Sequence, residues 1–180
     1  MAVLVAAVIV LGGLVLVNLL LTAAVIRKLR KITKELPAGR ARDGFGLPVG
    51  AEVPAFSALT VADTKVTTDD LAGGRTLVGF FSTDCRHCLP NAPGFAATAR
   101  DAAADGVRNL AVVVAGEEEP AGLLDALGDA VTVVVENEGG ALTDAFAVAG
   151  FPSFFLVGPD ATIAASGHEP ESLLAAPSLT

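Results

Sequence analysis

The stretch RTLVGFFSTDCRHC, residues 75–88, joins a continuous apolar run to two closely spaced cysteines. Residues 76–81 are rich in β-branched and aromatic side chains without alternation, which predicts a strand buried on both faces. The cysteines, Cys85 and Cys88, follow directly, at the start of a predicted helix over residues 85–104. A buried strand that leads into a helix with a Cys-x-x-Cys pair is the feature around which the remaining segments must be arranged.

Short apolar runs alternate with helix-like stretches through the rest of residues 47–180. We predict further buried strands over residues 110–115, 131–135 and 153–157, and helices over residues 121–127 and 141–147. This alternation is typical of βαβ units around a largely parallel sheet. The turn residues Gly158-Pro159-Asp160 predict a final hairpin with a strand over residues 162–165, followed by a brief helix over residues 169–175.

An additional strand pair, residues 56–61 and 65–67 around Asp63, is predicted before the first central strand. The predicted fold class is therefore α/β, with a central mixed sheet flanked by helices and an added N-terminal hairpin.

The N-terminal segment is far more apolar than a folded domain requires. No side chain from Ala2 to Ile26 is charged, and 25 helical residues at about 1.5 Å each exceed the roughly 30 Å hydrocarbon core of a bilayer. The competing interpretation is a cleaved signal peptide, but no Lys or Arg precedes the run and the run is too long. We predict one transmembrane anchor over residues 1–26, with the lipid bilayer as a partner.

The net charge of −8 is the sum of a basic segment and a longer acidic segment. Residues 27–42 contain a single acid, Glu35, and seven bases, which leaves five bases and nineteen acids for residues 43–180. The seven bases are Arg27, Lys28, Arg30, Lys31, Lys34, Arg40 and Arg42. We therefore predict a basic juxtamembrane segment and linker over residues 27–46 and an acidic folded domain over residues 47–180, with no nucleic acid as a partner.

The Cys85-x-x-Cys88 spacing suits thiol–disulfide chemistry. On a helical first turn the two sulfurs come close enough for a disulfide, and the helix N-terminus stabilises a thiolate on the first cysteine. Structural zinc would need further ligands, and only His87 and His168 remain, so no metal is expected. A passive disulfide is disfavoured because it would close a very short loop. The expected redox group is the Cys85–Cys88 disulfide itself, with no other cofactor.

Phe151 and Pro152 stand directly before the predicted strand over residues 153–157. A proline at this place suits a cis peptide that fixes the loop opposite the cysteines, and its missing N–H leaves a neighbouring backbone group free for a substrate strand. The alternative is an ordinary proline at the start of a strand. We predict that Phe151 and Pro152 form the substrate loop.

Three segments together resemble the membrane-anchored thioredoxin-like disulfide reductases of the TlpA and ResA type, with MauD as a close variant. They are residues 47–88, CLPNAPGF at residues 88–95 with Pro93 in the first helix, and VAGFPSFFLVGPDATI at residues 148–163. The resemblance, over residues 47–176, implies a thioredoxin-like fold with Cys85 as the attacking cysteine, Cys88 as the resolving cysteine and Pro152 as the cis-proline. It also implies a client protein with cysteines or disulfides and a thiol–disulfide protein as electron donor.

The chain departs from that family at several positions. It contains no Trp and has Asp84 before the first cysteine, and Gly79 stands where many thioredoxins bury an acid. Arg86 and His87 are expected to favour the Cys85 thiolate, while Asp84 opposes it. On balance we predict a disulfide less reducing than that of cytosolic thioredoxin, which lies at about −270 mV.

Two further functions compete with the membrane-tethered oxidoreductase. The same thiols, with His87 or His168, suit a copper(I)-handling accessory module. A peroxiredoxin would carry Pro and Thr where this chain has Val78 and Ser82. We expect His168 to be a solvated surface side chain, the alternatives being a copper ligand or a proton relay. The residues Glu117-Glu118-Glu119 are expected to form a solvated acidic loop, with partner docking as the alternative.

The side of the membrane on which the domain lies is left open by the sequence. The basic residues after the predicted anchor favour a cytoplasmic domain, whereas the family resemblance favours the outside. The client, the electron donor, the oligomeric state and the net direction of the reaction are likewise not encoded in any motif of this chain.

Overall fold

The computed structural model describes residues 1, 12–13 and 46–175. The predicted anchor over residues 1–26 and the predicted linker over residues 27–46 lie almost entirely outside these residues. Within the described part of the chain, no helix has the length and apolar character needed to cross a bilayer. The chain divides into residues 1–38 and residues 39–180, and the fold described below belongs to the second unit.

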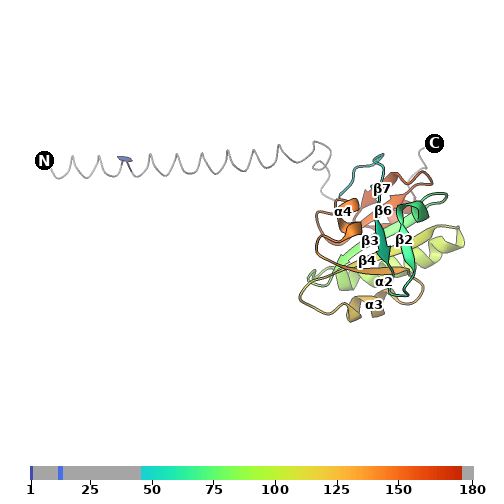
Figure 1. Cartoon of the computed structure of the whole chain (residues 1–180). Coiled ribbons are helices and arrows are strands. Elements are labelled where there is room, and N and C mark those ends of the chain that lie inside the picture. Colours follow the sequence, from blue (N-terminus) through green and yellow to red (C-terminus); the bar gives the residue numbers. More distant parts are fainter. Residues whose placement is uncertain (2–11, 14–45, 176–180) are drawn as a thin grey trace. The chain divides into compact units, whose positions relative to one another are not determined.

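A five-stranded sheet lies at the centre of the fold, in the order β5-β4-β3-β6-β7 (Figure 1). Its strands are β3 (Thr76–Ser82), β4 (Arg108–Ala115), β5 (Val133–Asn137), β6 (Ser153–Val157) and β7 (Ile163–Gly167). The helices are η1 (Thr68–Leu71, a 3-10 helix), α2 (Cys88–Ala104), α3 (Ala121–Leu127), α4 (Ala141–Ala145) and α5 (Pro170–Leu174). The strands and helices predicted from the apolar runs are therefore all present.

The sheet is mixed, as the predicted fold class requires. β3 pairs parallel with β4 and β4 with β5, whereas β3 pairs antiparallel with β6 and β6 with β7. The narrower prediction of a largely parallel sheet is wrong. β6 enters the sheet antiparallel to β3, and the turn over Gly158-Pro159-Asp160 then makes β7 antiparallel to β6, because two strands joined by a short hairpin run in opposite directions.

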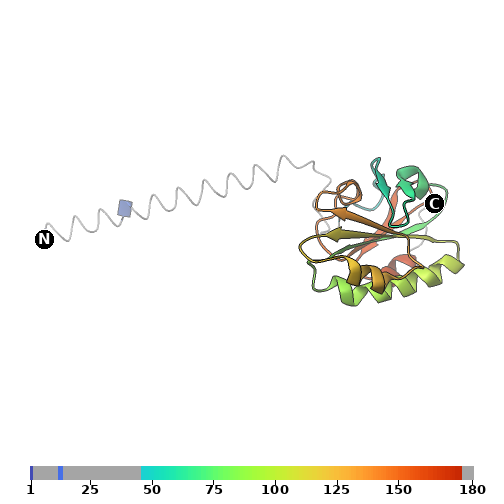
Figure 2. The ribbon, with the colours of Figure 1, turned by 60° about the horizontal axis from the view of Figure 1, so that its bottom comes forward.

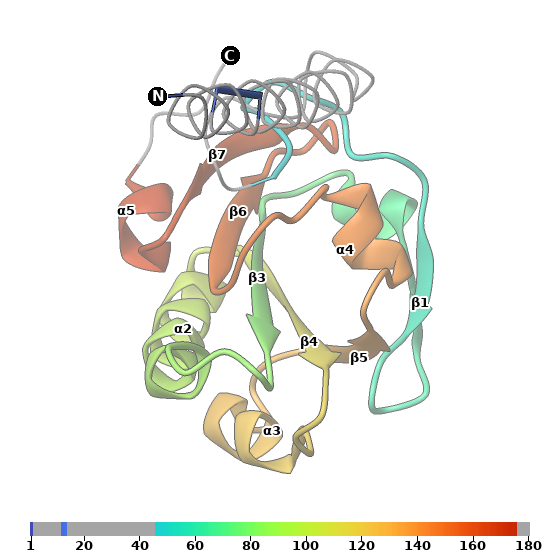
Figure 3. The same ribbon diagram turned by 90° about the vertical axis from the view of Figure 1, so that its left-hand side faces the viewer.

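The two faces of the sheet are covered by different helices (Figures 2 and 3). Along β3, Leu77 and Phe81 belong to the core under α2, α3 and α5, while Val78 and Phe80 belong to the core under η1 and α4. Successive side chains of a strand point to opposite faces, so a strand buried on both sides must be apolar throughout. This explains why residues 76–81 lack alternation.

The N-terminal hairpin is present as predicted, formed by β1 (Ser57–Leu59) and β2 (Lys65–Thr67). Its tip reaches the edge of the central sheet, where Thr60 forms a bridge with Val134 and the Val61 amide donates to the Val133 carbonyl. The hairpin therefore covers part of the otherwise open edge of β5.

The start of β5 differs from the prediction by two residues. The side chain of Asn109 donates to the Ala130 carbonyl and accepts a hydrogen bond from the Thr132 amide. These side-chain bonds hold the chain before β5, so regular pairing begins at Val133 rather than Val131. A long-range side-chain contact of this kind is not visible in the hydrophobic pattern.

Candidate active site

The two cysteines lie at the carboxyl end of β3, in the turn that leads into α2. The Cys85 amide donates to the Ser82 carbonyl (3.2 Å), and the Cys88 amide donates to the Cys85 carbonyl (2.9 Å). The helix begins at Cys88 with His87 as its N-cap, so the prediction that it begins at Cys85 is wrong. Cys85 is therefore a turn residue just before the helix, and Cys88 is its first residue.

The half-buried Cys85 thiol faces the loop that precedes β6. Its Sγ donates to the Phe151 carbonyl oxygen at 3.4 Å. The Phe151–Pro152 peptide bond is cis, as predicted, and the Ser153 hydroxyl donates to the Gly150 carbonyl at 2.6 Å within the same loop. The structure thus brings Cys85, Phe151 and Pro152 together, although they are more than 60 residues apart in the chain.

Cys88 occupies a different environment, because its side chain is wholly buried in the core beneath α2. The Ser82 amide donates to its Sγ at 3.3 Å. Burial, followed by the hydrogen bond with the Cys85 thiol, raises the pKa of Cys88 to about 12, although the Ser82 amide acts in the opposite direction. Cys88 therefore holds its proton throughout the physiological pH range.

The space beside Gly79 is filled by an aromatic ring. A Cβ atom at Gly79 would lie 2.7 Å from the ring of Phe95, which stacks on Phe154 with ring centroids 5.6 Å apart. A carboxylate at this position would therefore collide with the ring. The sequence showed that an acid is missing at position 79, and the structure shows that an apolar group takes its place.

Asp84 is directed toward the loop after β4. Its carboxylate accepts hydrogen bonds from the amides of Glu117 (3.1 Å) and Glu118 (3.5 Å), and it lies against Gly116, where an added Cβ would collide with it. The Gly116 amide donates to the Thr83 hydroxyl at 2.9 Å. These contacts give Asp84 a role in fixing the loop, whereas its predicted influence on Cys85 stays a prediction.

Arg86 and His87 are exposed and contact each other. The Nε of Arg86 donates to the Nε2 of His87 at 2.9 Å, and the Asn91 side chain donates to the His87 carbonyl at 2.7 Å. The predicted effect of both residues on Cys85 stays a prediction.

His168 is exposed, as predicted, and also contacts the cis-proline loop. Its Nδ1 lies 3.1 Å from the Pro152 carbonyl oxygen. The residues that sequence reasoning missed at this site are Phe95, which fills the space beside Gly79, and Leu89, an exposed apolar side chain in the first turn of α2. Leu89 directly follows Cys88, so its position was the only signal that could have identified it.

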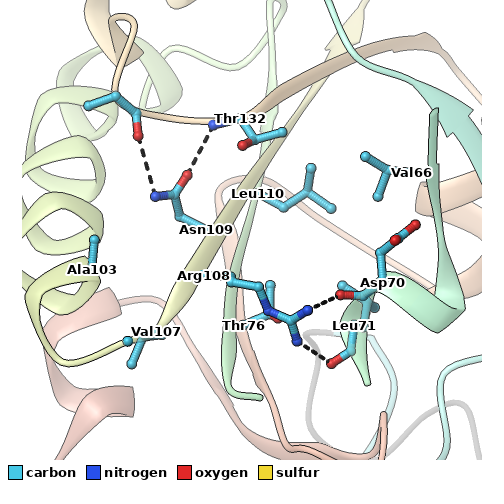
Figure 4. A pocket seen from close by; sticks show the side chains of 12 residues that line it. Val66, Asp70, Leu71, Thr76, Ala103, Val107, Arg108, Asn109, Leu110 and Thr132 are labelled. Atoms are coloured by element: carbon cyan, nitrogen blue, oxygen red, sulfur yellow. Dashed lines mark hydrogen bonds between the residues drawn. The ribbon is translucent and has the colours of Figure 1, made fainter. Parts of the chain in front are cut away.

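A cavity of about 450 Å³ lies at the amino ends of β3 and β4, at the other end of these strands from the cysteines (Figure 4). The Arg108 guanidinium donates there to the carbonyls of Asp70 and Leu71. The Thr67 hydroxyl and amide donate to the Asp70 carboxylate and lower its pKa. Arg108 thus holds η1 against the start of β4, and the Asp70 carboxylate binds Thr67 at the start of η1.

Within the described residues, no group of three or more His, Cys, Asp and Glu side chains is placed to hold a metal ion.

A thioredoxin-like sheet with a Cys-x-x-Cys pair after its central strand and a cis-proline opposite defines a thioredoxin-like thiol–disulfide protein. The chain belongs to the Redoxin family, whose family model matches residues 48–177, and it is a thiol–disulfide oxidoreductase of that family. No protein of curated function matches the chain significantly.

Solved structures agree with this fold. The thioredoxin domain of a thiol-disulfide oxidoreductase from Bacteroides vulgatus is 21% identical with a TM-score of 0.58, over 72% of this chain and 94% of that one. A protein described as the thiol:disulfide interchange protein DsbE from Chlorobium tepidum is 20% identical with a TM-score of 0.59, over 72% and 92%. A protein described as a thioredoxin from Neisseria meningitidis is 26% identical with a TM-score of 0.56, over 66% and 81%.

Proposed function

We propose that this chain is a membrane-tethered oxidoreductase of the TlpA type that acts on disulfides of client proteins, with Cys85 as the attacking and Cys88 as the resolving thiol. The observation that carries the proposal is the contact of the half-buried Cys85 thiol with the Phe151 carbonyl, while Cys88 is wholly buried behind it. A client can reach only one of the two sulfurs.

In the proposed reaction the Cys85 thiolate attacks one sulfur of a client disulfide, and the other client sulfur leaves as a thiolate. Cys88 then loses its proton and attacks the Cys85 sulfur, which releases the second client thiolate and forms the Cys85–Cys88 disulfide. Two electrons pass from the protein to the client. A second thiol–disulfide protein, acting as electron donor, restores both thiols.

The cis-proline loop supplies the proposed binding contact. Pro152 has no N–H, so an extended client segment would pair with the backbone of Phe151 beside the reacting sulfur. The names of structural relatives support a protein client, since the Bacteroides protein is called a thiol-disulfide oxidoreductase and the Chlorobium protein a thiol:disulfide interchange protein.

Trapping of mixed disulfides tests the reaction. The full-length Cys88→Ser variant is expected to accumulate adducts with client proteins, because the resolving thiol is lost, whereas the matched Cys85→Ser variant is expected to form none. Adducts are counted by mass spectrometry after non-reducing electrophoresis. Equal trapping by both variants, or none by Cys88→Ser under oxidising and reducing conditions, contradicts the assigned roles. Copper(I) binding without insulin reduction would favour the metal-handling alternative.

The membrane tether rests on the uncharged run from Ala2 to Ile26 and on the seven basic residues after it. We expect the full chain to remain with the membrane fraction after alkaline extraction, and a chain that begins at Leu47 to be released. A reporter fused after Thr180 that is active on only one side of the membrane identifies the side of the catalytic domain. Release of the full chain by alkali contradicts the tether.

A further inference from the structure

A small groove adjoins the Cys85 thiol. Its volume is about 80 Å³, and its lining combines the thiol with apolar and acidic side chains. The residues that line it are Ser82, Thr83, Cys85, Leu89, Glu118, Glu119, Gly122 and Leu123. The groove is much smaller than the roughly 300–1,000 Å³ of a typical small-molecule site, so it suits part of one side chain of a bound protein.

The apolar part of the groove is formed by two leucines. Leu89 is 52% exposed, and it lies in the first turn of α2 directly after the resolving cysteine. Leu123, from α3, is buried and completes this apolar wall. An aliphatic stem of three or four methylene groups could lie along such a surface while a charged end group stays in water.

The acidic part of the groove is held in place by the residue before Cys85. The Asp84 carboxylate accepts hydrogen bonds from the amides of Glu117 and Glu118, which fixes the backbone of the loop between β4 and α3. Of the three consecutive glutamates, Glu118 and Glu119 line the groove, whereas Glu117 is exposed outside it. The turn that carries the thiol is thus tied to the loop that carries the two carboxylates.

We infer that this groove selects client segments in which a lysine or arginine neighbours the reacting cysteine, with Glu118 and Glu119 as the specificity-determining residues. The aliphatic stem contacts Leu89 and the positive end group meets the two carboxylates. This selectivity rests on the proposed function and specifies the class of client on which the oxidoreductase acts. The basic residues nearest to Cys85 in sequence, Arg86 and His87, bond to each other and do not line the groove.

The test uses the full chain in detergent and two quenched fluorescent peptides, each with one internal disulfide flanked by Lys in one peptide and by Glu in the other. We expect kcat/KM to favour the Lys peptide by about tenfold, since exposed ion pairs are individually weak. The double substitution Glu118→Gln with Glu119→Gln is expected to reduce this preference to below threefold. The control Glu117→Gln, which removes one carboxylate of the same loop outside the groove, is expected to retain the preference, while Glu118→Gln and Glu119→Gln, each of which also removes one carboxylate, are each expected to reduce it.

Asp84 acts on this preference as a positioning residue. We expect Asp84→Ala to reduce the Lys preference through KM, because the freed loop no longer holds the carboxylates in the groove, while both peptides are still reduced. Equal reduction of both peptides by the unsubstituted protein overturns the inference and leaves the proposed function intact. A preference that survives the double substitution, or that Glu117→Gln removes to the same extent, also overturns it. Failure to reduce either peptide contradicts the proposed function itself.

Discussion

The two cysteines stand three residues apart and lie in opposite environments. Cys85 is half-buried, contacts a backbone carbonyl and adjoins a groove whose lining includes Glu118 and Glu119. Cys88 is wholly buried among the apolar side chains that α2 and the sheet enclose. This difference suits the proposed reaction, in which the accessible Cys85 sulfur would meet the client and the buried Cys88 would keep its proton until the mixed disulfide has formed.

The separation follows from the position of the pair at the carboxyl end of a central strand. β3 is the middle strand of the sheet, and its side chains belong to the hydrophobic cores on both faces. The turn over residues 83–87 leads out of these cores, and α2 then brings the chain back onto one face of the sheet. Cys85 lies in the turn, and Cys88 is the first residue of α2, where the chain packs against the sheet again.

The largest expected effect is a difference in alkylation of the two thiols. The raised pKa of Cys88, about 12, lowers its thiolate fraction at pH 8 by about 1,000-fold relative to an ordinary thiol of pKa 9.0. We expect iodoacetamide to modify Cys85 and to leave Cys88 unmodified, as measured by mass spectrometry of peptides from the reduced protein. Comparable labelling of both cysteines in the folded protein would show that the apolar shell does not protect Cys88.

The difference between the two cysteines can also be tested by the pH dependence of the step in which Cys88 attacks the sulfur of Cys85. After Cys85 attacks Ellman's reagent and releases one thiolate, attack by Cys88 releases the second. Desolvation by burial, the largest cause of the raised pKa of Cys88, persists in this intermediate. Below that pKa the thiolate fraction rises about tenfold per pH unit, so we expect the second release, followed by stopped-flow absorbance, to accelerate about tenfold per unit from pH 7 to 9.

The control for this measurement is Cys88→Ser, which is expected to release only the first thiolate. A rate of second release that levels off below pH 8 would reveal a proton acceptor near Cys88, contrary to the apolar surroundings that Phe95 creates beside Gly79.

Much of the fold was predictable because its signals are local. β6 (Ser153–Val157) and α3 (Ala121–Leu127) begin and end at the predicted residues, and the cis bond before Pro152 was expected from its place at the start of β6. Runs of apolar side chains and turn residues act over a few positions, and a sequence displays these directly.

The details of the site were less predictable because they depend on contacts between distant segments. Nothing near Gly79 indicates that Phe95 covers it, and nothing near Asp84 indicates that the amides of Glu117 and Glu118 bind its carboxylate. Both contacts join elements that are adjacent only in the folded sheet. A side chain next to a thiol in sequence, such as Asp84, can therefore have its hydrogen-bond partners in a distant segment.

The packing of Phe95 on Gly79 can be tested by adding a single methyl group. Gly79→Ala places a Cβ 2.7 Å from the ring, and such overpacking typically costs about 1–3 kcal/mol. We expect the free energy of unfolding in urea to fall by that amount. In the double variant with Phe95→Leu, the added loss due to Gly79→Ala is expected to shrink, because the smaller side chain makes room. Additive losses would mean that the two residues do not compete for the same space.

The smallest expected effect concerns His168. Its ring contacts the Pro152 carbonyl, in the loop that faces the accessible Cys85. Exposed hydrogen bonds contribute little, about 0.5–1.5 kcal/mol even when well formed. We expect His168→Ala to lower the unfolding free energy by less than about 1 kcal/mol and insulin reduction by less than threefold. His168→Gln, whose amide can still donate to the carbonyl, is expected to recover most of the loss. A more than tenfold reduction in turnover with unchanged stability would instead assign His168 a part in positioning the cis-proline loop for the client. Unchanged stability would mean that the core around Cys88 is intact, so the change would lie in the geometry around Pro152 and Cys85.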